Sequence, residues 1–309
     1  MKRLLGIILL GILFVNQSNS LTIKQIDQDN KTIGYFDNDD LKDYIVREKK
    51  NQEKVVYSIF INNGKSYSKK ITFEVKSDDF SEIENSLDNL FISNPKKGEI
   101  VINASCCGSF KSAVSTHYKY FEENDNWILY KNSNSTIESD FLPTIEVQFL
   151  DFSYTIDNKN VKNNSSIKNK ELSNLKITNE TFFKTLFNKY KDANDNKTSN
   201  KVSGNLNFDD LADLLALIPI DKKNINKYND LAYYIGESKN GSICSIFLLK
   251  EIIKKDPSRV VAYLNLADAQ WNFDQKENAS RYYKKYSLLM KSSSKDLTKI
   301  PQRVYDRIK

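Results

Sequence analysis

The chain has 309 residues, of which 39% are hydrophobic and 28% are charged, a composition typical of a globular protein. At roughly 100–200 residues per domain, this length predicts two domains. The formal net charge is +6, but Lys and Arg are interspersed with Asp and Glu and form no strong basic block. That pattern argues against a nucleic-acid-binding protein, in which basic residues gather on one face.

Residues 1–20 have the three parts of a secretory signal peptide. Lys2 and Arg3 precede an apolar run that ends at Val15, and the small residues Ser18 and Ser20 follow. The apolar run is shorter than the about 20 residues that a membrane-spanning helix needs. We therefore expect cleavage after residue 20, no transmembrane segment in the mature chain, and a periplasmic or secreted protein. An uncleaved N-terminal anchor is the alternative.

Residues 21–156 form a predicted β-rich domain. The β-prone runs Val55–Ile61 and Tyr67–Val75 flank an Asn-Asn-Gly sequence, which predicts a hairpin. Further strands are predicted at Glu99–Ala104, Thr116–Phe121, Trp127–Tyr130 and Thr144–Ile156. Strands at this spacing predict an antiparallel meander rather than alternating strands and helices.

An acidic turn precedes these strands. Asp37, Asp39 and Asp43 keep the spacing of the turn of FG-GAP (integrin-propeller-like) proteins. The strand after this turn, the Asn-Asn-Gly hairpin and the later Cys-Cys-Gly-Ser-Phe-Lys segment resemble exported bacterial β domains built on this unit, over about residues 30–130. Carboxylates at such a spacing are suited to Ca²⁺. Tyr35 and Asp40 stand where that family has its first ligand and its glycine. These departures favour a turn bonded to its own backbone over a calcium site, and the sequence predicts no other cofactor.

The cysteines and the single histidine are the candidates for a catalytic group. Cys106 and Cys107 are adjacent, Cys244 is distant, and His117 is the only histidine. No nucleophile motif surrounds them, so we expect buried thiols and an ordinary strand histidine. A Cys–His pair and a disulfide from Cys244 to one of the adjacent cysteines are the alternatives.

The second half of the chain is predicted to be helical. Residues 157–205 are rich in Asn, Lys and Ser and are expected to be a polar linker with one short helix at Phe182–Tyr190. Residues 206–309 form the helical domain. Asn207 is a predicted N-cap for a helix with Leu211 and Leu214 on one face, and Pro219 is expected to end that helix.

Two segments after about Asn226 resemble the tetratricopeptide repeat, a helical pair of about 34 residues. The residues that carry the resemblance are the pairs Leu231-Ala232 and Leu266-Ala267, the closing Asp256-Pro257, the aromatic Tyr263, the small Ala279, and Tyr283 and Tyr286 in the later packing positions. The stretch Asp296–Ile308 is expected to supply a capping helix. The resemblance covers about 85 residues and implies a concave surface that binds a protein or peptide.

The predicted fold class is therefore α+β, with an antiparallel β domain followed by an all-α repeat-like array. The predicted function is a non-catalytic, exported protein-binding protein of the adaptor or inhibitor (immunity) type. The family places the first helix of each repeat on the concave face, so the predicted partner-binding residues are Tyr263, Asn265, Asp268 and Trp271. The alternatives are an envelope hydrolase or thiol enzyme with its site in the β domain, and a purely structural envelope component.

Overall fold

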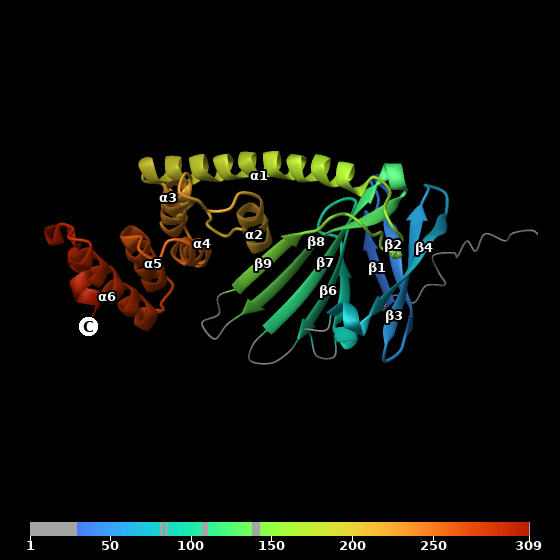
Figure 1. The fold of residues 1–309 in the computed structure, drawn as a ribbon, viewed down its shortest axis with the longest axis horizontal. Helices are drawn as coiled ribbons and strands as arrows, with labels where there is room; N and C mark the ends of the chain where they lie inside the picture. Colours follow the sequence, from blue (N-terminus) through green and yellow to red (C-terminus); the bar gives the residue numbers. More distant parts are fainter. Residues whose placement is uncertain (1–29, 81–82, 84–85, 107–110, 138–142, 309) are drawn as a thin grey trace, which may run out of the picture.

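The computed structural model describes residues 30–308 except 81–82, 84–85, 107–110 and 138–142. The predicted signal peptide and Cys107 lie outside these residues. The molecule is elongated, with two β-sheets at one end and a stack of helices at the other (Figure 1). One long helix, α1, runs along both parts. The predicted α+β class, with strands first and helices second, is confirmed.

The first sheet is a four-stranded antiparallel meander in the order β1-β2-β3-β4. Its strands are β1 (Lys31–Gly34), β2 (Asp43–Lys50), β3 (Lys54–Asn62) and β4 (Tyr67–Lys76). The predicted hairpin is the β3–β4 pair. The Asn63 side chain accepts the backbone N–H groups of Lys65 and Ser66, and Gly64 supplies a φ of +83°. Residues within the turn itself therefore stabilise this hairpin.

The second sheet is a five-stranded antiparallel meander in the order β5-β6-β7-β8-β9. Its strands are β5 (Leu90–Ser93), β6 (Glu99–Cys106), β7 (Lys111–Phe121), β8 (Asn126–Ile137) and β9 (Pro143–Phe149). Strands β7 and β8 are longer than predicted, and β9 ends at Phe149 rather than at Ile156. Many of the extra residues are Ser, Asn and Lys, which carry little β-propensity of their own, so these segments are held by pairing with their neighbours.

The two sheets share one hydrophobic core. Ile45, Ile59 and Phe73 from the first sheet pack against Ile100 and Trp127 from the second. All five side chains are at most 2% exposed. Burial of this apolar surface is the main favourable term that holds the sheets together.

The longest element is α1 (Asn164–Asp195), a single helix of 32 residues. The prediction of a polar linker with one short helix is wrong here. Ile167 and Leu172 pack against the second sheet, whereas Leu186 and Tyr190 are buried in the helical part. At 1.5 Å per residue the helix is about 48 Å long, so it connects the two parts rigidly.

The remaining helices are stacked in chain order (Figure 1). They are α2 (Phe208–Leu217), α3 (Ile225–Gly236), α4 (Ser242–Lys255), α5 (Val260–Asn272), α6 (Lys276–Ser292) and α7 (Gln302–Arg307). The predicted N-cap is confirmed, because the Asn207 side chain accepts the N–H of Asp209. The α2 helix ends two residues before Pro219, as predicted. Within the described residues, no helix has the length and hydropathy needed to cross a membrane.

An ion pair joins the two parts where α2 packs against the second sheet. Lys131 Nζ on β8 lies 2.9 Å from both carboxylate oxygens of Asp213 on α2. The two side chains are only 6% and 17% exposed. Burial raises the pKa of Asp213, and the charge of Lys131 opposes that shift. Nothing in the sequence pairs these two residues, which are 82 positions apart.

Candidate functional site

The four predicted partner-binding residues all lie on α5, but they are not equally available. Tyr263 is 6% exposed and its hydroxyl donates to the carbonyl of Pro257. Asp268 accepts hydrogen bonds from Tyr283, Arg303 and Arg307. The chain's own C-terminal helix α7 therefore occupies part of the surface that the sequence assigned to a partner.

Trp271 and Asn265 complete the predicted set. The guanidinium of Arg307 lies 4.6 Å from the ring centre of Trp271, and Lys276 Nζ lies 4.3 Å from it. Trp271 is half-buried and packs beside the core formed by α5, α6 and α7. Asn265 is also half-buried. Of the two interpretations of Trp271, packing between helices accounts for these contacts without a partner.

A recess of about 380 Å³ lies between α5 and α6. Tyr263 and Gln270 line it from α5, and Asn278, Arg281, Tyr282 and Lys285 line it from α6. Among these, only Tyr263 was predicted from the sequence. A basic pair at positions i and i+4 on a predicted amphipathic helix is the sequence feature that could have indicated the other side of the recess.

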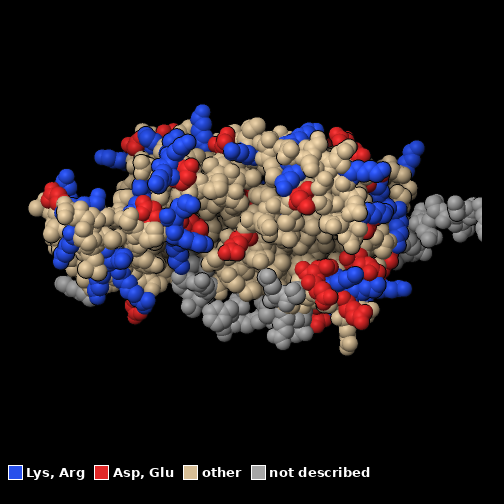
Figure 2. All heavy atoms as spheres, in the orientation of Figure 1, with Lys and Arg blue, Asp and Glu red and all other residues tan. Residues whose placement is uncertain are grey.

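The charge of the chain is unevenly distributed along its length. Residues 242–309 contain 14 Lys and Arg against 7 Asp and Glu, a net +7. Residues 21–241 contain 30 Lys and Arg against 33 Asp and Glu, a net −3. Lys and Arg side chains are spread over the helical end of the molecule in Figure 2. The helices α4 to α7 thus form the positively charged end of the molecule. The sequence did not indicate this, because basic and acidic residues are interspersed along it.

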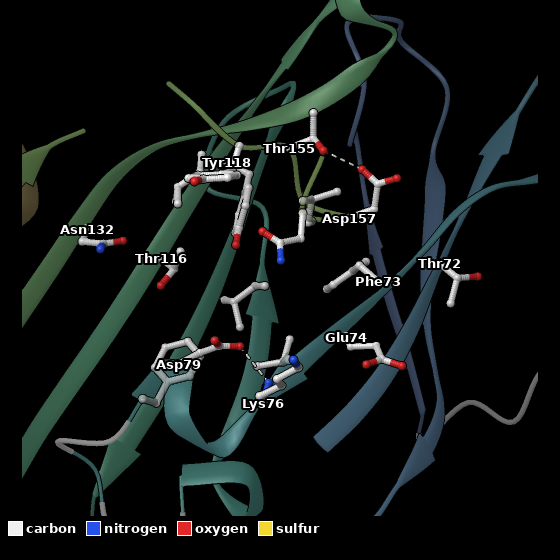
Figure 3. A pocket seen from close by; sticks show the side chains of 17 residues that line it. Thr72, Phe73, Glu74, Lys76, Asp79, Thr116, Tyr118, Asn132, Thr155 and Asp157 are labelled. Carbon is white, nitrogen blue, oxygen red and sulfur yellow. Dashed lines mark hydrogen bonds between the residues drawn. The ribbon is translucent and has the colours of Figure 1, made fainter. Parts of the chain in front are cut away.

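A groove of about 600 Å³ lies in the β domain, between β4 and the second sheet (Figure 3). Backbone and side chains of residues 72–76 form one wall, and Tyr118 and Asn132 lie on the other. A second recess of about 360 Å³ continues it and shares Asp79, Phe80 and Asn132 with it. The Oδ1 atom of Asn132 is buried and has no hydrogen-bond partner.

Two carboxylates of this groove, those of Glu74 and Asp157, do not form an acid–base pair. Glu74 is ion-paired with Lys54 at 2.6 Å. The pKa of Asp157 is lowered despite its burial, because Lys159, Thr155 and Asn126 all donate to it. A general acid for hydrolysis needs a carboxyl whose pKa is raised toward neutrality. Neither Glu74 nor Asp157 therefore supports the hydrolase alternative.

The three carboxylates of the acidic turn do converge. One oxygen from each of Asp37, Asp39 and Asp43 lies within 4.8 Å of the others. Asp37 accepts the N–H of Asp39, and Asp39 accepts the N–H of Leu41. This is the self-bonded turn that the sequence favoured. Asp40, at the family's glycine position, points away to Lys97.

Asp43 is the buried member of this cluster, at 0% exposure. Its two oxygens accept the backbone N–H groups of Phe36 and Asn62. Burial raises the pKa of Asp43 to about 6, although these hydrogen bonds oppose the shift. Ca²⁺ takes 6–8 oxygen ligands. Three carboxylates that already accept backbone N–H groups are a weak donor set for it.

The cysteine and histidine residues do not form a reactive pair in the described part of the chain. His117 on β7 is 8% exposed, its Nε2 lies 3.2 Å from Ser133 Oγ, and burial lowers its pKa to about 3. The backbone of Cys106 pairs with Ser112, whereas His117 pairs with Val101. Five residues along β6 separate these positions by roughly 17 Å. Cys244 is 1% exposed, and burial raises its pKa.

Comparisons with known proteins add no name to this geometry. No family model matches the chain, no curated protein matches it, and no solved structure matches it. The resemblances to tetratricopeptide repeats and to FG-GAP turns therefore stand on the residues alone.

Proposed function

We propose that this chain is a non-catalytic protein-binding protein of the adaptor or inhibitor type that acts outside the cytoplasm. The helical array from α3 to α7 is its binding module. The observation that carries the proposal is the recess between α5 and α6 on the positively charged end of the molecule. Export is inferred from the signal-peptide pattern of residues 1–20.

The arrangement of the helices supports this proposal. From α3 to α6, consecutive helices are joined by short turns, in which Asn240 and Asp274 have φ values of 59° and 64°. Tyr263 and Ala267 of α5 share a core with Tyr283 of α6 and Val304 of α7. Stacked helical pairs of this kind present an extended surface, and such surfaces serve recognition more often than chemistry.

Site-specific cross-linking tests the proposal. A photoreactive residue is placed at Tyr233 or Leu288 in the helical array, or at Ile33 or Phe91 in the β domain, all of which are exposed. The full mature chain is then mixed with envelope extract of the source cell. We expect a discrete cross-linked protein from the helical positions. Cross-links from the β-domain positions alone, or from none of the four, would contradict the proposal.

A further inference from the structure

We propose that the recess between α5 and α6 binds an acidic residue of an extended partner segment, and that Leu288 contacts an apolar residue of the same segment. This inference rests on the proposed function and names the chemistry of its partner. Three features carry it: the two cations at the mouth of the recess, the buried amide that lines it, and the exposed leucine on the next helical turn.

The cations of the recess are available to a ligand. Arg281 and Lys285 are four residues apart on α6, so their side chains lie on the same face of the helix. The only ion pair that Arg281 makes among the described residues is with Glu277, at 4.0 Å, and both side chains are largely exposed. For Lys285, no ion pair is present in the described part of the chain. Arg281 offers a planar fork of donors that matches a carboxylate.

The amide of Gln270 offers an acceptor for a donor group of the ligand. Gln270 is 1% exposed, and its side-chain carbonyl oxygen has no hydrogen-bond partner. An unsatisfied buried acceptor costs free energy until a donor reaches it. A peptide brings backbone N–H donors together with its carboxylates, so one segment can reach both this acceptor and the two cations. The lining of the recess therefore fits an acidic peptide.

Leu288 extends the site by one turn. It lies seven residues after Arg281, which returns it to the same side of α6, and it is 62% exposed. Tyr263 and Tyr282, whose ring centres are 6.2 Å apart, form an aromatic wall inside the recess. Apolar contacts beside a charged anchor are the usual composition of a binding hot spot. The net +7 of residues 242–309 would also steer an acidic partner toward this end of the molecule.

The probe is a short fluorescein-labelled peptide of Glu, Leu and Gly, and the matched control peptide has Gln in place of Glu. Fluorescence anisotropy with the full mature chain should show binding of the Glu peptide that weakens as salt is added. The double variant R281E/K285E should weaken that binding at least tenfold. The variant K291E/K295E makes the same change in net charge in the last turn of α6 and just after it, and should weaken binding by about threefold or less. Leu288→Ala should weaken it by about threefold to tenfold, the order expected for one lost apolar contact.

The inference is overturned if R281E/K285E and K291E/K295E weaken binding equally, because the charge would then act without the recess. It is also overturned if phosphatidylglycerol vesicles or single-stranded DNA compete for the Glu peptide and lose affinity with R281E/K285E, since the site would then recognise phosphate. A cross-linked protein at Tyr233 or Leu288 without any binding of the Glu peptide would leave the proposed function standing and refute only the acidic partner. Circular dichroism of each variant confirms that it is folded.

Discussion

Replacing Lys131 by Met should destabilise the protein by about 3 kcal/mol. The change removes the cation that lies 2.9 Å from both oxygens of Asp213, in a contact where the side chains are only 6% and 17% exposed. Removing one partner of a buried ion pair costs roughly 3–5 kcal/mol, because the other charge stays buried without compensation. Asp213 retains some exposure and can take up a proton, so the lower end of that range applies.

The double variant K131M/D213L separates the ion pair from simple packing. With both charges replaced by apolar groups, the double variant should be more stable than K131M alone, with a coupling free energy of about 2 kcal/mol between the two sites. The matched control is Lys54→Met, which breaks the exposed Lys54–Glu74 pair and should cost less than about 1 kcal/mol.

Urea unfolding followed by tryptophan fluorescence measures these changes in both parts of the molecule. Trp127 lies in the core between the sheets and Trp271 lies in the helical array, so the variants W127F and W271F isolate one reporter each. If K131M costs no more than K54M, or if the effects of K131M and D213L simply add, the two charges do not interact and the docking of α2 on the second sheet has been misjudged.

Three further predictions concern single buried groups. His117→Phe should make the protein less sensitive to acid. The folded pKa of His117 is about 3, below the unfolded value of 6.5, so this group makes the wild type lose stability as the pH falls below about 6.5. The urea midpoints at pH 4.5 and 7 should therefore lie closer together in the variant than in the wild type. Asp43→Asn should change the pH dependence in the opposite sense. The folded pKa of Asp43 is about 6, above the unfolded value, so ionisation of Asp43 lowers the stability of the wild type as the pH rises through 6. The variant should lack this loss of stability when the urea midpoints at pH 4.5 and 7 are compared. Cys244 should react with a thiol reagent only after unfolding, because it is 1% exposed and its pKa is raised. Peptide mapping of the labelled native chain measures this reaction. Rapid labelling of Cys106 or Cys107 in the same experiment would favour the thiol-enzyme alternative.

Features with a local cause were predictable from the sequence. The Asn-Asn-Gly turn gave the β3–β4 hairpin, and Asn207 gave the start of α2. The helices α3 to α6 follow the periodicity that was identified, and α7 lies within the predicted capping segment. Each of these depends on residues within a few positions of one another, where propensity, capping and turn chemistry agree.

Features that depend on distant residues were missed. The first half of α1 is Asn-, Ser- and Lys-rich, and it is helical because Ile167 and Leu172 pack on the second sheet and Glu171 pairs with Lys119 at 2.5 Å. The same holds for the contact between Lys131 and Asp213. The four predicted partner-binding residues lie together on α5, but the sequence did not indicate that Arg303 would form an ion pair with Asp268.

The number of residues in α1 determines both the distance between the two parts of the molecule and their rotation about the helix axis. Ile167 and Leu172 face the second sheet, while Leu186 and Tyr190 face the helical core, and one uninterrupted helix separates these pairs. Each inserted residue would turn one pair relative to the other by about 100° and push them about 1.5 Å apart. Insertion of a single residue into α1 would therefore rotate one of these pairs away from the apolar surface on which it packs, whereas most loops accept an inserted residue without consequence. Sequences that share this architecture should vary in the composition of residues 173–181 while keeping their number.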